Sequence, residues 1–171
     1  LGEKIDFPED YYRGEYIKDI ARQLKEQDGN SLKNEPAEGK FKQQAEQNIF
    51  DDIKKTLERL GVIFDVFYNE NTLYETGKVA EVIQELRNMN LAYDQDGAVW
   101  LKVTELGGEK DKVIVKSTGE PTYRLPDIAY HREKIRRGFE MVIDVLGADH
   151  VATYPDVLAG LKALGYDSSM V

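Results

Sequence analysis

Apolar residues recur at helical spacing along the first third of the chain. One apolar stripe lies within residues 16–24, and a second spans residues 41–60 with its members mostly four positions apart. This spacing predicts two amphipathic helices, each with one face packed and the other in water. Gly61 comes directly after the second stripe, where glycine commonly ends a helix. Residues 30–39 between the stripes are rich in turn-forming residues, which predicts a surface loop.

From Gly61 onward the pattern changes to short apolar runs that alternate with helical stretches. Residues 62–67 and 141–146 are nearly continuous apolar runs rich in β-branched side chains, which is typical of strands. Helical spacing returns in three stretches, at residues 79–89, 126–137 and 153–164. Strands that alternate with helices predict a mostly parallel α/β sheet.

A β-hairpin interrupts that alternation. Strand patterns at residues 92–93 and 98–103 flank the dipeptide Asp96-Gly97, which is favoured in two-residue hairpin turns. Residues 112–116 alternate between apolar and polar side chains, which predicts one further strand.

These patterns together predict an α/β fold with an added helical part. Residues 1–60 are expected to form a helical region, and residues 61–171 the α/β core. The sheet of that core is expected to be mostly parallel, with the β-hairpin as an excursion from it.

The composition limits the classes of protein to which the chain can belong. Its 171 residues, 41% of them hydrophobic, suit one domain of ordinary size with a small appendage. The absence of cysteine excludes disulfide scaffolds, zinc fingers, iron–sulfur clusters and thiol nucleophiles, and it fits a reducing compartment. A net charge of −9 argues against a surface-wide nucleic-acid platform, and no apolar run is long enough to span a bilayer. We therefore expect a cytoplasmic protein without a membrane or DNA partner.

The densest group of candidate functional residues lies around the predicted helix at residues 126–137. Tyr123 precedes this helix, and Asp127 lies in its first turn. Ligands of open α/β sheets bind at such strand-to-helix junctions. The helix dipole favours an ionised Asp127, which could then accept hydrogen bonds from a cation. A purely structural role for Asp127, as an ordinary residue of a helix start, remains an alternative.

Other candidates follow the two strand-like runs. Glu70 comes soon after the first run and could meet the other junctions, although a loop glutamate is commonly solvated. Asp149 and His150 follow the second run and could face a ligand, although a simple turn explains them equally well. His131 shares a helix face with Asp127 and is expected to be a surface or hydrogen-bonded histidine. Two histidines without metal-ligand spacing predict no metal site.

Taken together, these segments resemble the catalytic domain of arginyl-tRNA synthetases, which are class I aminoacyl-tRNA synthetases. The blocks that carry the resemblance occur in the family's order, at residues 8–17, 61–67 with Glu70, 96–101, 110–116, 121–131, 137–139 and 147–150. The resemblance implies a ligase that activates arginine with ATP and Mg²⁺ and transfers it to tRNA(Arg). It also implies a Rossmann-like core in which residues 1–60 form a helical insertion.

The resemblance assigns roles to the candidate residues. It implies that Tyr123 and Asp127 read the guanidinium group of arginine, that Glu70 is a further acidic residue of the pocket, and that His150 faces the substrate. A guanidinium group presents five donors in a rigid fork, so its pocket needs carboxylates and oriented hydroxyls. The chain departs from many bacterial relatives directly after His150, where Val151-Ala152-Thr153 replaces a second histidine, a glycine and a tyrosine.

Two motifs of class I synthetases do not occur in the sequence. The chain has neither a His-x-Gly-His type motif nor a Lys-Met-Ser-Lys type loop, which hold the ATP phosphates in that family. Because adenylate formation depends on positioning and on charge stabilisation at the phosphates, we expect an inactive central fragment of a larger enzyme. The start at Leu1, without a methionine, fits this expectation. ATP and Mg²⁺ are expected to act in the parent enzyme and not to bind tightly to this chain.

Two alternatives remain open at this point. The chain could be a truncated, non-catalytic module that binds arginine or a protein partner. It could also come from a different class I synthetase, although Glu70, Tyr123 and Asp127 together favour a cationic amino acid.

Overall fold

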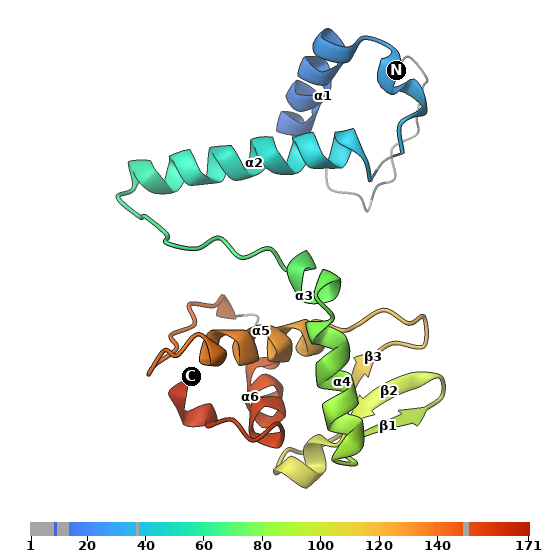
Figure 1. Ribbon diagram of the computed structural model, residues 1–171, viewed down its shortest axis with the longest axis vertical. Coiled ribbons are helices and arrows are strands. Elements are labelled where there is room, and N and C mark those ends of the chain that lie inside the picture. The colour runs from blue at the N-terminus through green and yellow to red at the C-terminus, as the bar shows by residue number, and fades with distance from the viewer. Residues whose placement is uncertain (1–8, 10–13, 37, 149–150) are drawn as a thin grey trace. The chain divides into compact units, whose positions relative to one another are not determined.

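The computed structural model describes residues 9, 14–36, 38–148 and 151–171 (Figure 1). The chain divides into two compact units, Leu1–Val66 and Phe67–Val171. Among the described residues, no helix has both the length and the apolar character that crossing a membrane requires.

The first unit is helical. It contains α1 (Glu15–Asp28), a short 3₁₀ helix (Ser31–Asn34) and α2 (Lys40–Arg59). Its core is formed by buried side chains on α1 and the 3₁₀ helix, with partly buried side chains of α2 packed against them: Ile20, Leu24 and Leu32, with Phe41, Ala45 and Ile49. The two helices predicted from the apolar stripes are therefore confirmed.

The second unit combines four α-helices with a small sheet. The helices are α3 (Asn71–Glu75), α4 (Lys78–Asn88), α5 (Arg124–Arg136) and α6 (Tyr154–Ala163). The strands are β1 (Ala92–Gln95), β2 (Ala98–Leu101) and β3 (Lys112–Val115), and the described residues of the unit also include the 3₁₀ helices η2 (Val103–Leu106) and η4 (Ser168–Met170). The sheet has the order β1-β2-β3 and is antiparallel throughout.

The β1–β2 hairpin forms where the sequence predicts it. Asp96 and Gly97 have φ values of 52° and 75°, and positive φ at both central residues is what the favoured two-residue hairpin turn requires. The register places Tyr93 opposite Trp100. Their rings stack with centroids 6.5 Å apart, which adds a cross-strand aromatic contact to the hairpin.

The mostly parallel sheet predicted from the sequence is not formed by the residues that the structure describes. Neither residues 62–67 nor residues 141–146 belong to a strand. Ile63 is 84% exposed and Val145 is 94% exposed, so these apolar runs are not covered as a parallel sheet would require. The apolar pattern indicates strand-forming character, but a strand also needs a neighbour to accept its backbone hydrogen bonds. The structure thus supports the α/β class and not the predicted topology.

The core of the second unit lies between the helices and the sheet. Fully buried side chains come from α4, β2, β3, α5 and α6: Leu86, Leu101, Ile114, Leu125, Ile128 and Leu161. The contact between α5 and α6 is especially close at Gly160, where an added Cβ would lie 2.8 Å from Ile128 Cγ1 and would also meet Ile128 Cδ1. Gly160 therefore lets α6 approach α5, the helix that carries the candidate site.

Replacing Gly160 by alanine is expected to destabilise the second unit by about 1–3 kcal/mol through overpacking. The higher helix propensity of alanine offsets up to about 1 kcal/mol of this loss. Ile128 is fully buried and cannot turn away into solvent. Urea unfolding of G160A measures the net change. The double variant G160A/I128V removes the Cδ1 atom and should recover part of the loss, whereas a stabilised G160A would contradict the close approach.

Candidate functional site

The start of α5 is held against both β3 and α6. The Thr122 hydroxyl donates to the carbonyl of Val113 at 2.9 Å, and the Thr122 amide donates to the carbonyl of Ile114 at 2.9 Å. One residue into the helix, Arg124 Nε donates to Asp156 Oδ2 of α6 at 2.7 Å. These bonds fix the first turn of α5, in which Asp127 lies.

Glu70 and Asp127 line the same cavity, which has a volume of about 160 Å³. Glu70 directly precedes α3, and Asp127 comes from the first turn of α5. The cavity is enclosed by a small set of side chains: Tyr68, Glu70, Leu73, Pro126, Asp127 and Tyr130. Two carboxylates in one small, partly apolar cavity favour a cationic ligand.

Tyr74 on α3 adds a hydroxyl to this acidic region. Its hydroxyl donates to Glu70 Oε1 at 3.4 Å. Burial raises the pKa of Tyr74, and the negative charges of Glu70 and Asp127 raise it further. The phenol therefore stays protonated at neutral pH and available as a donor to a carboxylate.

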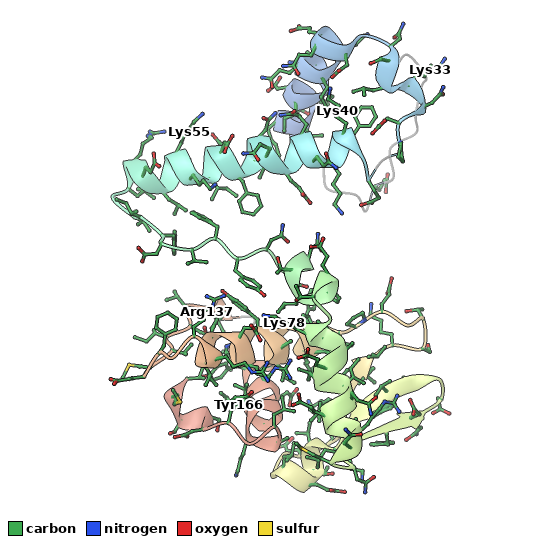
Figure 2. The ribbon with its side chains drawn as sticks, viewed as in Figure 1. Lys33, Lys40, Lys55, Lys78, Arg137 and Tyr166 are labelled. Carbon is green, nitrogen blue, oxygen red and sulfur yellow. The ribbon has the colours of Figure 1, made fainter. Side chains whose placement is uncertain are left out.

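Two stacked aromatic rings form one wall of the cavity. The ring centroids of Tyr68 and Tyr130 lie 4.7 Å apart with an interplanar angle of 29°. Arg137, labelled in Figure 2, places its guanidinium carbon 5.0 Å from the Tyr68 centroid, and Lys134 Nζ lies 4.8 Å from the Tyr130 centroid. These cation–π contacts hold the two rings in place. Lys134 lies in the last turn of α5, and Arg137 directly follows that helix.

A second cavity, of about 200 Å³, shares Asp127 and Tyr130 with the first. It is lined in addition by His131, Lys134 and Asp144. Burial acts to raise the pKa of Asp144, but hydrogen bonds and charge from Lys134 and His131 outweigh it and hold that pKa below its usual value. The Asp144 carboxylate is therefore ionised and already neutralised by its neighbours.

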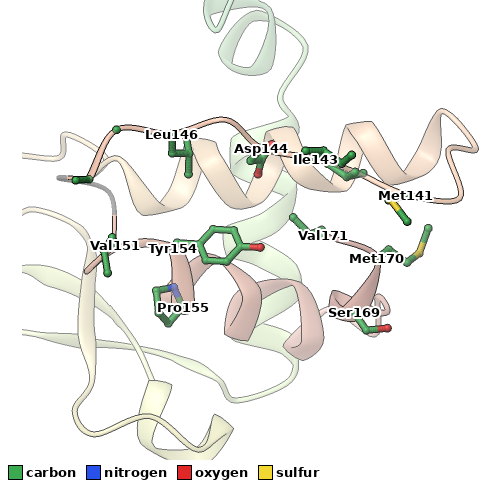
Figure 3. A pocket seen from close by; sticks show the side chains of 13 residues that line it. Met141, Ile143, Asp144, Leu146, Val151, Tyr154, Pro155, Ser169, Met170 and Val171 are labelled. Atoms are coloured by element: carbon green, nitrogen blue, oxygen red, sulfur yellow. The ribbon is translucent and has the colours of Figure 1, made fainter.

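A third cavity lies next to the predicted second strand-like run. It has a volume of about 760 Å³ and extends between residues 141–148 and the start of α6, with η4 at its side (Figure 3). The Val142 amide donates to the carbonyl of Met170 at 2.7 Å. Gly147 and Ala148, which belong to the predicted site segment, are part of its lining.

The structure brings two of the predicted site residues together and leaves a third apart from them. Glu70 and Asp127 meet in one cavity. Tyr123 is the residue before α5, is 85% exposed and does not line that cavity. His150 lies outside the described residues. His131 is buried and hydrogen-bonded, so it is the hydrogen-bonded histidine, and not the surface histidine, of the two kinds that the sequence allows.

Sequence reasoning missed the side chains that surround the two carboxylates. Tyr74 lies four residues after Glu70, a spacing that could have suggested a contact across one helical turn. The spacing of Tyr68 and Asp144 in the sequence does not indicate their contacts, because each contacts a residue of α5 that is far from it along the chain or outside its own element: Tyr68 stacks on Tyr130, and Asp144 pairs with Lys134. Among the described residues, no group of three or more His, Cys, Asp or Glu side chains is placed to hold a metal ion.

Comparisons with known proteins fit this arrangement. The sequence model described as tRNA synthetases class I (R), catalytic domain, matches residues 4–171. An arginine–tRNA ligase of Desulfotalea psychrophila is 59% identical over the whole chain, and one of Chlorobium phaeovibrioides is 51% identical over 99% of it. The chain spans 31% and 32% of the lengths of these two curated relatives.

A solved structure gives the same result for the fold. A crystal structure described as an arginyl tRNA synthetase from Campylobacter jejuni matches with a TM-score of 0.87 and 33% identity. The match covers 98% of this chain and 37% of that protein. The chain therefore belongs to the arginine family of class I tRNA synthetases and corresponds to a segment of their catalytic domain.

Proposed function

We propose that this chain supplies the arginine side-chain pocket of an arginine–tRNA ligase, an enzyme that activates arginine with ATP and transfers it to tRNA(Arg) in the cytoplasm. The observation that carries the proposal is the shared cavity of Glu70 and Asp127. Family membership supports the identity of the amino acid, because the relatives are named arginine–tRNA ligases.

The chemistry of the cavity suits a guanidinium group. Glu70 and Asp127 together offer four carboxylate oxygens, and a guanidinium group can donate two parallel hydrogen bonds to a carboxylate. The first turn of α5 favours the ionised form of Asp127 through the helix dipole. The stacked rings of Tyr68 and Tyr130 give the cavity an apolar wall against which the flat group can lie.

Tyr123 and His150 enter the proposal with different support. Tyr123 stands at the start of α5 with its side chain in solvent, where its hydroxyl is available to a substrate at the rim. His150 follows Gly147 and Ala148 in the sequence, and these two residues line the cavity beside residues 141–148. We assign both residues to the substrate-facing surface on the basis of the family resemblance.

The role of this chain in catalysis is to bind and orient arginine. In adenylate formation, the arginine carboxylate attacks the α-phosphorus of ATP and pyrophosphate leaves; the tRNA hydroxyl then attacks the arginyl carbonyl and AMP leaves. A pocket that fixes the guanidinium end of arginine also orients the carboxylate at its other end for attack on the α-phosphorus.

The sequence has neither phosphate-binding motif, so the chain alone is not expected to form the adenylate. The strand-like runs 62–67 and 141–146 would then join a parallel sheet in the complete ligase.

A ligand comparison tests the pocket directly. We expect the chain to bind arginine at least about tenfold more tightly than citrulline, which has the same shape but no charge, because a hydrogen bond to a charged group contributes about 1.5–3 kcal/mol. Isothermal titration calorimetry with both ligands measures the difference, with E70Q as the matched pocket variant. Equal affinity for the two ligands would contradict a guanidinium pocket. Arginine-dependent pyrophosphate exchange by the isolated chain would contradict its proposed inactivity.

One observation favours a second candidate function. Both pocket carboxylates lie within the compact unit Phe67–Val171, so a free-standing arginine-binding module is also consistent with the geometry. The same titration distinguishes the two functions. Micromolar binding of arginine by the isolated chain favours the module, whereas weak binding that tightens in the complete ligase favours the segment of an enzyme.

A further inference from the structure

His131 is a buried titratable residue that the proposed pocket chemistry does not use. It lies on α5, one turn after Asp127, and only 8% of it is exposed. Its Nδ1 atom lies 2.7 Å from the backbone carbonyl oxygen of Asp127, and its Nε2 atom is hydrogen-bonded to Asp144 Oδ2. The ring therefore lies between the carbonyl of Asp127 and the carboxylate of Asp144, and Lys134 Nζ lies 3.5 Å from its Nε2 atom.

Lys134 completes the cluster. Its Nζ atom lies 2.5 Å from Asp144 Oδ1, so both oxygens of that carboxylate have a hydrogen-bond partner. The groups that face His131 are therefore Asp127 and Lys134 on α5 and Asp144 on the neighbouring segment. Tyr154 of α6 lines the same cavity.

The cluster joins residues 141–146 to α5. The Val142 amide anchors the start of this segment to Met170. Farther along, Ile143 and Val145 on either side of Asp144 are largely exposed, so they add little packing. The buried bonds of Asp144 to His131 and Lys134 are therefore what holds the middle of the segment against the helix.

We propose that His131 is a positioning residue for the arginine pocket, because its ring links the carbonyl of Asp127 to the carboxylate of Asp144. This link fixes the turn of α5 from which the Asp127 carboxylate projects. It also occupies Oδ2 of Asp144, whose Oδ1 is paired with Lys134, so the Asp144 carboxylate in the adjoining cavity does not compete for the guanidinium group. The inference rests on the proposed function.

Nitrogen-15 NMR of the histidine rings in this chain tests the two ring contacts. The chain has two histidines, so an H150Q sample leaves a single ring to observe. Adding D144N to that sample is expected to change the shift of His131 Nε2 more than that of Nδ1, because Asp144 is a partner of Nε2 alone. Ring shifts that do not respond to D144N would overturn the proposal.

Kinetics of the complete ligase test the positioning role. H131N keeps a donor near the Nδ1 position, and H131Q keeps one near the Nε2 position, but neither can hold both acceptors. We expect each variant to raise the KM for arginine by about tenfold, as loss of one net charged hydrogen bond would, with kcat and the KM for ATP nearly unchanged.

The outcomes separate this inference from the proposed function. If H131N and H131Q leave the KM for arginine unchanged while D127N raises it, the positioning role is wrong and the pocket stands. If D127N also leaves it unchanged, the pocket itself is wrong. If the variants do not fold, the NMR measurement on the chain with its native His131 decides the question.

Discussion

Replacement of Asp127 by asparagine is expected to raise the KM for arginine of the complete ligase by about 10- to 150-fold, with the KM for ATP nearly unchanged. The size follows from the about 1.5–3 kcal/mol that a hydrogen bond to a charged group contributes, at 1.4 kcal/mol for each factor of ten. Asparagine keeps the shape of the side chain and its place at the helix start, but it removes the charge that pairs with guanidinium. Pyrophosphate exchange with arginine and ATP varied separately measures both constants.

Asp94 provides a matched control for this substitution. It is an aspartate of β1 that pairs with Arg87 at 2.6 Å on the surface and does not line either acidic cavity. D94N removes a carboxylate of the same kind and should leave both KM values unchanged. A D127N enzyme that loses ATP and arginine affinity equally would point to collapse of the α5 start instead of loss of a substrate contact.

The helices and the hairpin could be predicted because their signals are local. The apolar stripe of α2 and the glycine after it are both contained in one stretch of sequence. The turn at Asp96 and Gly97 likewise depends on two adjacent residues that adopt positive φ. Residues 141–146 carry an equally clear strand pattern, but the strand would need a backbone partner that no local pattern can specify. That is why the helices and the hairpin are confirmed, whereas the strands predicted at residues 62–67 and 141–146, and with them the parallel sheet, are not.

The candidate site could be predicted only in part. Glu70 and Asp127 were selected because carboxylates at element junctions can face a ligand, and the structure places both at one cavity. Their proposed roles toward arginine remain predictions. The partners of these residues depend on contacts across the fold: Tyr68 stacks on Tyr130, and Asp144 meets His131. Such pairs leave no periodic trace in the sequence, so only the tertiary structure reveals them.

Arg132 allows the sharpest test of what holds α5 in place. It has an exposed fraction of 0% and is the largest of the fully buried side chains in the described part of the chain. Its guanidinium donates to Glu81 Oε2 at 2.8 Å, to Glu85 Oε1 at 3.0 Å and to the carbonyl of Lys78 at 3.2 Å. All three acceptors belong to α4, so Arg132 links α4 to the helix that carries Asp127.

Replacement of Arg132 by alanine is expected to lower the free energy of unfolding by about 2–5 kcal/mol, because it leaves a cavity between two packed helices. Replacement by methionine fills most of that space and removes a buried charge whose Nε has no hydrogen-bond partner among the described residues. Glu81 and Glu85 are partly exposed, so water can solvate their carboxylates when the arginine is gone.

The difference between the two variants separates packing from charge. Buried ion pairs often contribute little beyond an apolar residue of similar volume, so R132M should lose no more than about 1–2 kcal/mol. Urea unfolding of the chain, followed by circular dichroism at 222 nm, measures both changes. If R132M is as unstable as R132A, the three hydrogen bonds to α4 dominate and the packing argument is wrong. If the free energy of unfolding of R132M is close to that of the native chain, the volume that Arg132 fills is what holds α5 in place.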